Sequence, residues 1–178
     1  MKTFTFDSKL WVPRKLDEVF PFFTDALNLE EITPPWLQFR VVSPAPVRMQ
    51  VGTEIDYRLK LRGIPLHWRS KITGWNPPYR FIDEQIAGPY RSWVHEHKFQ
   101  EVGGHTLCED HVEYSVFGGE IINRLLVRRD VQTIFGYRSE RLQQIFQKLP
   151  TEESGQIARM KMAPVGNLQA LQHQKRYA

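Results

Sequence analysis

The chain has 178 residues, of which 41% are hydrophobic and 25% charged, and its formal net charge is +4. These values are typical of a globular protein, and the length fits one domain with a substantial core. The single cysteine, Cys108, excludes an internal disulfide and any zinc site built from several cysteines.

The positive charge is concentrated in the C-terminal third. Residues 1–118 hold 14 Lys and Arg against 15 Asp and Glu, whereas residues 119–178 hold 10 against 5. A basic segment could bind nucleic acid or anionic lipid. Because the sequence has no zinc-finger spacing, RNP aromatic pattern or Lys/Arg-rich block, we favour a solvated helix face with a basic tail and predict no nucleic-acid partner.

The sequence also bears on where the protein resides. It contains no recognisable signal peptide and no apolar stretch long enough to cross a bilayer. We therefore expect a cytoplasmic protein without stable membrane insertion.

The first predicted elements are one strand and two short helices. Residues 3–12 alternate between apolar and polar side chains, which predicts a half-buried strand. Residues 16–23 carry apolar side chains at helical spacing, and Pro21 inside this segment should kink or shorten the helix. A second short helix is expected within residues 25–32, before two consecutive prolines stop it.

The middle of the chain is predicted to consist of strands. Alternating patterns and turn residues delimit strands at 39–43, 53–61, 64–75 and 80–86. The short connection before residue 80 does not set the register of the strand that follows. The side of the sheet on which Asp83 and Glu84 lie therefore stays open.

Residues 88–115 predict a β-hairpin around Gly103-Gly104, because glycine accepts the positive φ of a two-residue turn. This register pairs His97 with Asp110 and extends to four further pairs: Val102 with His105, Phe99 with Cys108, His95 with Val112, and Trp93 with Tyr114. One face of the hairpin is therefore apolar but carries two histidines and one aspartate. Such a face is a candidate lining for a pocket with polar spots.

From Gly119 the apolar period becomes helical, and Pro150 ends the pattern. We expect one long amphipathic helix, broken near Leu126, with an apolar stripe that begins at Ile121 and faces the sheet. The predicted fold class is α+β: a curved antiparallel sheet of about seven strands around this helix, in a domain spanning 1–149. The weakly patterned residues 150–178 should form a mobile tail. Because one helix cannot fully cover such a sheet, a cavity is expected between them.

Four stretches of the chain carry a resemblance to a known family: residues 23–37 (FTDALNLEEITPPWL), 75–85 (WNPPYRFIDEQ), 88–99 (GPYRSWVHEHKF) and 135–142 (FGYRSERL). They resemble the START-like superfamily (SRPBCC, polyketide cyclase and lipid transport), in its bacterial stand-alone ligand-binding branch. The resemblance covers about residues 3–148 and implies the helix-grip fold. Some members are fused to short-chain-dehydrogenase-like epimerase domains, which implies a functional link to such an enzyme.

The resemblance implies that the protein binds a hydrophobic small molecule, such as a lipid, an isoprenoid or a polyketide-like compound, between the sheet and the long helix. Aromatic side chains would supply apolar contact area, and His95, His97 and Asp110 would supply polar anchoring. Arg138 lies on the apolar stripe of the helix, either as a further polar partner or with its charged end extended to solvent. The candidate ligand-binding residues are Tyr57, Trp68, Trp93, His95, His97, Asp110, Tyr114, Phe135 and Arg138.

The residues allow three other interpretations. His95 and His97 could share a metal with Asp110, but His95 and Asp110 are diagonal neighbours in the hairpin, so we assign no metal and no cofactor. If the protein is an enzyme, His97 and Asp110 would be the acid/base pair of a cyclase or dehydratase-like reaction. The third alternative is a protein-interaction module with a collapsed pocket. Because no nucleophile elbow or phosphate loop is present, a non-catalytic role is favoured.

Overall fold

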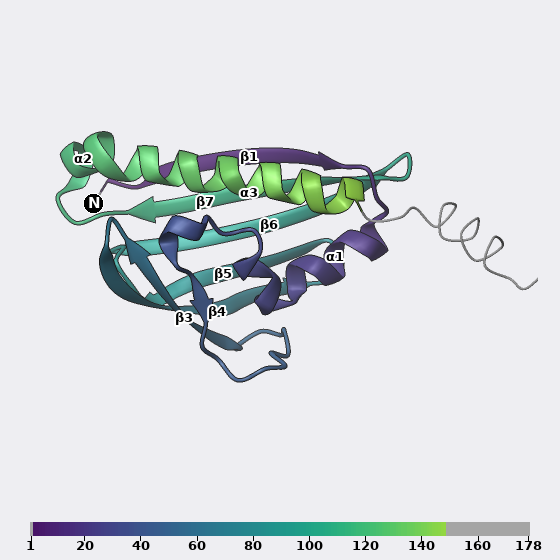
Figure 1. Ribbon diagram of the computed structural model, residues 1–178, viewed down its shortest axis with the longest axis horizontal. Coiled ribbons are helices and arrows are strands. Elements are labelled where there is room, and N and C mark those ends of the chain that lie inside the picture. Colours follow the sequence, from purple (N-terminus) through teal and green to yellow (C-terminus); the bar gives the residue numbers. More distant parts are fainter. Residues whose placement is uncertain (1, 149–178) are drawn as a thin grey trace, which may run out of the picture. The chain divides into compact units, whose positions relative to one another are not determined.

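A seven-stranded antiparallel sheet is the largest element of the computed structural model, which describes residues 2–148 (Figure 1). The predicted domain boundary at residue 149 and the predicted mobile tail lie outside the described residues. The elements in chain order are β1 (Phe4–Val12), α1 (Leu16–Thr24), η1 (Ala26–Glu30), η2 (Pro35–Leu37), β2 (Arg40–Val41), β3 (Glu54–Leu61), β4 (Ile64–Asn76), β5 (Arg80–Ala87), β6 (Ser92–Val102), β7 (His105–Ser115), α2 (Gly119–Ile122), η3 (Asn123–Val127) and α3 (Arg128–Lys148).

The strands follow the spatial order β1-β7-β6-β5-β4-β3-β2, so the first strand of the chain pairs with the last. Consecutive strands from β2 to β7 are joined as antiparallel neighbours. The register of β6 and β7 is the predicted one, with His97 opposite Asp110 and Trp93 opposite Tyr114. Gly103 and Gly104 form the turn with φ of +59° and +76°, which confirms the predicted hairpin.

The register of β5 answers the question that the sequence left open. Phe81 pairs with His97 and Asp83 pairs with His95, so Asp83 lies on the same face of the sheet as both histidines. On the other side of β5, strand β4 shows two register shifts, one between Arg69 and Ser70 and one near Gly74. Such irregularities increase the local twist of a strand and bend the sheet.

The short elements after β1 differ in detail from the prediction. Helix α1 keeps nine residues with Pro21 inside it, and buries Leu16, Val19 and Phe20. The second predicted helix is a 3-10 helix, η1, which begins where the Asp25 carboxylate accepts a hydrogen bond from the Leu27 amide at 3.0 Å. The prolines expected only to stop this helix instead start a further 3-10 turn, η2, because proline is compatible with a first helical position.

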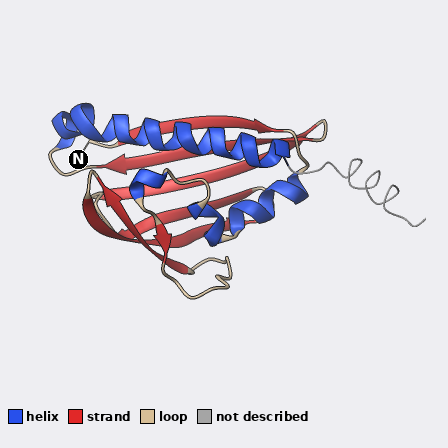
Figure 2. Cartoon of the chain, viewed as in Figure 1, coloured by secondary structure: helices blue, strands red, loops and turns tan. Residues whose placement is uncertain are grey.

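Helix α3 packs on the same face of the sheet as α1, and Figure 2 shows the helices gathered on that face. Its second half contributes Leu142 and Phe146 to a core with residues of β1, β6 and α1. Its first half contributes Val131 and Phe135 to a second cluster around Trp93, Val112 and Tyr114. The predicted α+β helix-grip architecture is confirmed.

The start of the C-terminal helical region departs from the expected apolar stripe. The predicted break is present as a turn of π-helix, η3, between α2 and α3. A π turn inserts extra residues per turn and rotates the preceding helix about its axis. As a result Asn123 is buried, whereas Ile121 and Leu125 are 70% and 62% exposed. Among the described residues, no helix combines the length and apolar character needed to cross a membrane.

Candidate functional site

A cavity of about 170 Å³ lies between the sheet and the helices that cover it. Strands β3 to β6 form its floor, and η1 and α3 contribute walls. Its lining is mainly aromatic and aliphatic, with Ser70, Asp83, His95, His97 and Arg138 among the polar exceptions. The arrangement is that of a largely apolar pocket in which a few polar groups converge.

Seven of the nine sequence-predicted ligand residues line this cavity: Tyr57, Trp68, Trp93, His95, His97, Phe135 and Arg138. The structure places the other two elsewhere. Asp110 lies on β7, where it contacts both histidines. Tyr114 is buried against the start of the C-terminal helical region, and its hydroxyl donates a hydrogen bond of 2.9 Å to Oδ1 of Asn123.

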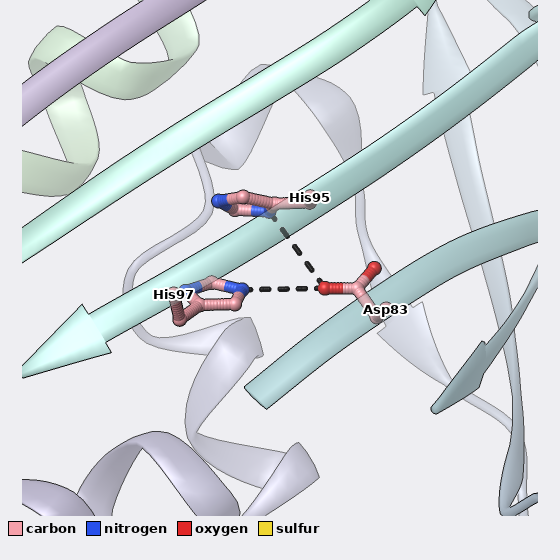
Figure 3. A group of neighbouring side chains, drawn as sticks. All are labelled: Asp83, His95 and His97. Carbon is pink, nitrogen blue, oxygen red and sulfur yellow. Dashed lines mark hydrogen bonds and ion pairs between the residues drawn. The ribbon is translucent and has the colours of Figure 1, made fainter. Parts of the chain in front are cut away.

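Two histidines and two aspartates form a closed cluster, of which Asp83, His95 and His97 line the cavity. Oδ1 of Asp110 lies 3.0 Å from Nε2 of His95 and 3.0 Å from Nδ1 of His97. Oδ2 of Asp83 lies 3.2 Å from Nε2 of His97 and 3.8 Å from Nδ1 of His95 (Figure 3). The contact between Nδ1 of His97 and Oδ1 of Asp110 does not have the geometry of a hydrogen bond. Each imidazole is thus held between two carboxylates.

Further hydrogen bonds orient the two carboxylates. Ser70 Oγ donates to Oδ1 of Asp83 at 3.3 Å, and the indole N–H of Trp68 donates to Ser70 Oγ at 3.0 Å. Ser8 on β1 donates to Oδ2 of Asp110 at 3.0 Å. Both carboxylates therefore use one oxygen for this support and direct the other toward the histidines.

Packing fixes the rings of the two histidines. Their centroids are 3.7 Å apart, and Phe81 stacks on His97 at 4.1 Å. His95 and His97 are only 5% and 6% exposed, so the cluster is shielded from bulk water. Interactions between charges are stronger in such surroundings than at the protein surface.

Sequence reasoning did not assign Asp83 to the site. Its neighbour two residues earlier, Phe81, is buried, and alternation along a strand then turns Asp83 to the same face. A large aromatic residue at the start of β5 was therefore the signal that could have placed this carboxylate in the pocket.

The two carboxylates of the cluster favour the ionised form. Burial alone would raise the pKa of Asp110, but the hydrogen bonds and charges of His95 and His97 outweigh it and hold this pKa well below its usual range. Burial would also raise the pKa of Asp83, but the hydrogen bond with His97 and the charges of both histidines outweigh burial and lower this pKa.

The two histidines differ in pKa although they are neighbours. For His97, burial disfavours the imidazolium, but contacts with Asp110 and Asp83 outweigh burial and raise the pKa. For His95, burial and the charge of the neighbouring His97 lower the pKa. The hydrogen bond with Asp110 raises it, but by less. Cys108 is also buried, and burial raises the pKa of its thiol to about 12.

Arg138 adds a polar group to the helix side of the cavity. Its guanidinium lies 5.0 Å from the centre of the Phe135 ring, within range of a cation–π contact. Its Nε is buried and has no hydrogen-bond partner among the described residues. A buried donor without a partner is uncommon in folded proteins and marks a place where a ligand oxygen can bind.

Sequence comparison identifies the family. The model of the family "polyketide cyclase / dehydrase and lipid transport" matches residues 12–134, which is more than half of the chain. The protein therefore belongs to this family, within the START-like superfamily. A search of curated proteins finds no significant match.

Solved structures share the fold at low sequence identity. The chain is similar to Ara h 8.0201 with a TM-score of 0.64 and 13% identity, over 83% of this chain and 100% of the other. A Zhui aromatase/cyclase from a Streptomyces species gives a TM-score of 0.65 and 12% identity, over 83% and 95%. Major latex-like protein 151 from Panax ginseng gives 0.62 and 12%, over 81% and 97%. At such low sequence identity, the similarity to these structures shows only that the fold is shared.

Proposed function

We propose that the protein binds a mainly apolar small molecule, carrying at least one hydrogen-bonding oxygen, in the cavity between the sheet and α3. The observation that carries this proposal is the combination of an aromatic lining with converging polar groups at one side. The family description, which includes lipid transport, supports the same class of function.

The size of the cavity limits what can bind without movement. At about 170 Å³ it is smaller than the roughly 300–1,000 Å³ of pockets for drug-sized ligands. It is similar to an engineered cavity of about 150 Å³ that holds benzene. One or two aromatic rings are therefore the natural occupant, and a lipid, isoprenoid or polyketide chain requires the cavity to widen.

The polar groups define how such a molecule would be oriented. The buried Nε–H of Arg138 offers a donor to a carbonyl, phenol or carboxylate oxygen. His95, His97 and Asp83 lie on the sheet side of the same cavity. A ligand with one oxygenated end would place that end between these groups and its apolar rings against Trp68, Trp93 and Phe135.

Isothermal titration calorimetry with a naphthol, two fused rings with one hydroxyl, tests this proposal. We expect one binding site per chain. Ile134→Trp should weaken binding by at least about tenfold, because Ile134 lines the cavity and the larger ring fills it. Thr133→Trp is the matched control, because Thr133 is the adjacent residue of α3 and is exposed.

Equal affinities of the two variants would overturn the assignment of the ligand to this cavity. Failure of the wild-type protein to bind the naphthol at its solubility limit would also count against it. Circular dichroism and thermal melting of both variants establish that any loss of binding does not come from unfolding.

A second candidate function is favoured by one observation, the presence of two imidazoles and a carboxylate in the lining of the cavity. General acid/base catalysis needs such groups within reach of the substrate. The family description includes cyclases and dehydrases, and one fold neighbour is an aromatase/cyclase. In a dehydration, one histidine would take the proton next to a carbonyl while the other donates a proton to the departing hydroxyl.

Incubation with an aromatic β-hydroxyketone tests this second function. Loss of water gives a conjugated enone, which is followed by its ultraviolet absorbance. A cyclase or dehydratase-like enzyme would show turnover that His97→Ala abolishes, a loss far larger than the change in affinity for the naphthol. Absence of turnover in a protein that binds the naphthol would leave the binding function and exclude dehydration of this substrate class.

The third interpretation, an interaction module with a collapsed pocket, finds less support. Such a module would have the space between sheet and helix filled by side chains. A cavity of about 170 Å³ in that space argues against it.

A further inference from the structure

We propose that Asp83, His95 and His97 form a binding site for one divalent metal ion, such as Zn²⁺ or Fe²⁺, on the floor of the cavity. This inference goes beyond ligand binding and does not rest on it. Two imidazoles and one carboxylate are a ligand set that such ions prefer, and the same set serves sites with open coordination positions.

The candidate ligand atoms lie close to one another. Oδ2 of Asp83 lies 3.2 Å from Nε2 of His97 and 3.8 Å from Nδ1 of His95, and one ligand atom from each residue lies within 4.8 Å of the others (Figure 3). Ligands about 2.1 Å from an ion lie roughly 3.0–3.5 Å from one another at octahedral or tetrahedral angles. The three groups therefore need only small shifts to bind a common ion.

Further contacts support the candidate ligands from behind. Metal-binding histidines direct their other ring nitrogen to a carboxylate, which fixes the ring. Here Nε2 of His95 forms a hydrogen bond of 3.0 Å with Oδ1 of Asp110, whereas Nδ1 of His97 lies 3.0 Å from the same oxygen but without the geometry of a hydrogen bond. Ser70 donates to Oδ1 of Asp83, which leaves Oδ2 for the ion. His95 and Asp83 thus have hydrogen-bonded partners, and His97 has a carboxylate in contact.

The charge of the cluster also favours a bound ion. A neutral imidazole carries one N–H, and each ring has one hydrogen-bonded carboxylate: Nε2 of His95 faces Oδ1 of Asp110, and Nε2 of His97 faces Oδ2 of Asp83. An ion bound beside Asp83 would take the place of the proton on Nε2 of His97, and Nδ1 of the same ring, 3.0 Å from Oδ1 of Asp110, can carry that proton instead. A divalent ion neutralises both carboxylates of the cluster while both imidazoles stay neutral, so the buried net charge is zero.

The position of the site leaves room for a ligand on the ion. Asp83, His95 and His97 all line the cavity, and three protein ligands leave at least one coordination position open toward it. The guanidinium of Arg138 also lines the cavity and is the positive group that opposes a cation here. The hairpin alone did not reveal this site, because the third ligand comes from β5.

The test uses the full-length protein, freed of metal with a chelator and titrated with Zn²⁺ by calorimetry and with Co²⁺ by visible absorption. We expect one ion per chain, and Co²⁺ bands of a site with nitrogen and oxygen ligands. Asp83→Asn and His97→Gln should abolish this binding. Asp110→Asn removes only the supporting carboxylate and should weaken it by about 10–100-fold.

His111→Gln is the matched control. This histidine also contacts two carboxylates, Asp7 and Glu113, but it is far more exposed than His95 and His97. The variant should bind the ion as the wild type does. Wild-type protein that binds no ion, or binding that survives both Asp83→Asn and His97→Gln, would overturn the proposal. Loss of metal binding in His111→Gln would also overturn the proposal.

A second measurement avoids reliance on variants that could fail to fold. In wild-type protein with nitrogen-15 labelled histidines, Zn²⁺ should shift the imidazole signals of two of the six histidines, His95 and His97. A response confined to other histidines would contradict the site. Circular dichroism of each metal-free variant shows whether it is folded before the titration.

Discussion

Replacing Phe146 with alanine is expected to lower the free energy of unfolding by about 3–5 kcal/mol. Phe146 is 1% exposed and belongs to the core that joins α3, α1 and the sheet. Its ring meets that of Phe22 edge-on at 5.3 Å. Truncation removes this burial and leaves a cavity that the surrounding strands cannot close. Equilibrium unfolding in urea, followed by circular dichroism, measures the change.

Phe117→Ala is the matched control for this prediction. Phe117 is 66% exposed, so its truncation should change the free energy of unfolding by no more than about 0.5 kcal/mol. Similar losses in the two variants would contradict the assignment of Phe146 to the core that holds α3 on the sheet.

The second large effect is expected from Asp110→Ala, which should lower the free energy of unfolding by about 3–5 kcal/mol in metal-free protein. Asp110 is the carboxylate that both buried histidines contact, and its side chain is 14% exposed. Its removal leaves His95 and His97 without their shared partner in surroundings where water cannot replace it. Urea unfolding at neutral pH measures the loss.

Asp7→Ala provides the comparison, because Asp7 also pairs with a histidine, His111, but its side chain is 67% exposed. Solvent screens that pair, so its loss should change the free energy of unfolding by less than about 1 kcal/mol. Equal effects of Asp7→Ala and Asp110→Ala would show that burial does not strengthen the contacts between Asp110 and the two histidines.

The hairpin of β6 and β7 could be predicted residue by residue from the sequence. A Gly-Gly turn sets the register, and the two-residue alternation then fixes which side chains share a face. His95, His97 and Asp110 were placed together on that basis. Asp83 was not, because β5 follows a connection without a fixed register and pairs with a strand, β4, that contains two irregularities.

Helical periodicity was less informative at the two ends of the C-terminal helical region. The π turn at η3 changes the phase of the helix, so Asn123 faces inward and Ile121 outward. At the other end, Ile145 and Phe146 are adjacent apolar residues, and the structure buries Phe146 more deeply. Both positions depend on how the helix docks on the sheet, and local spacing does not encode that.

The volume of the cavity also lay beyond sequence reasoning. It is the small difference between the space enclosed by a curved sheet and the volume of the many side chains that point into it. The sequence identified seven of the residues in the lining, from Tyr57 to Arg138, but not how much space they leave. That space decides which molecules fit.

Native mass spectrometry of the full-length protein tests the central claim most directly. The protein is measured as purified and after addition of the naphthol, with Ile134→Trp measured in parallel. We predict one bound small molecule per chain in the wild type and little or none in Ile134→Trp. An empty wild-type protein that also fails to take up the naphthol, or equal occupancy in Ile134→Trp, would contradict binding in the cavity between α3 and the sheet.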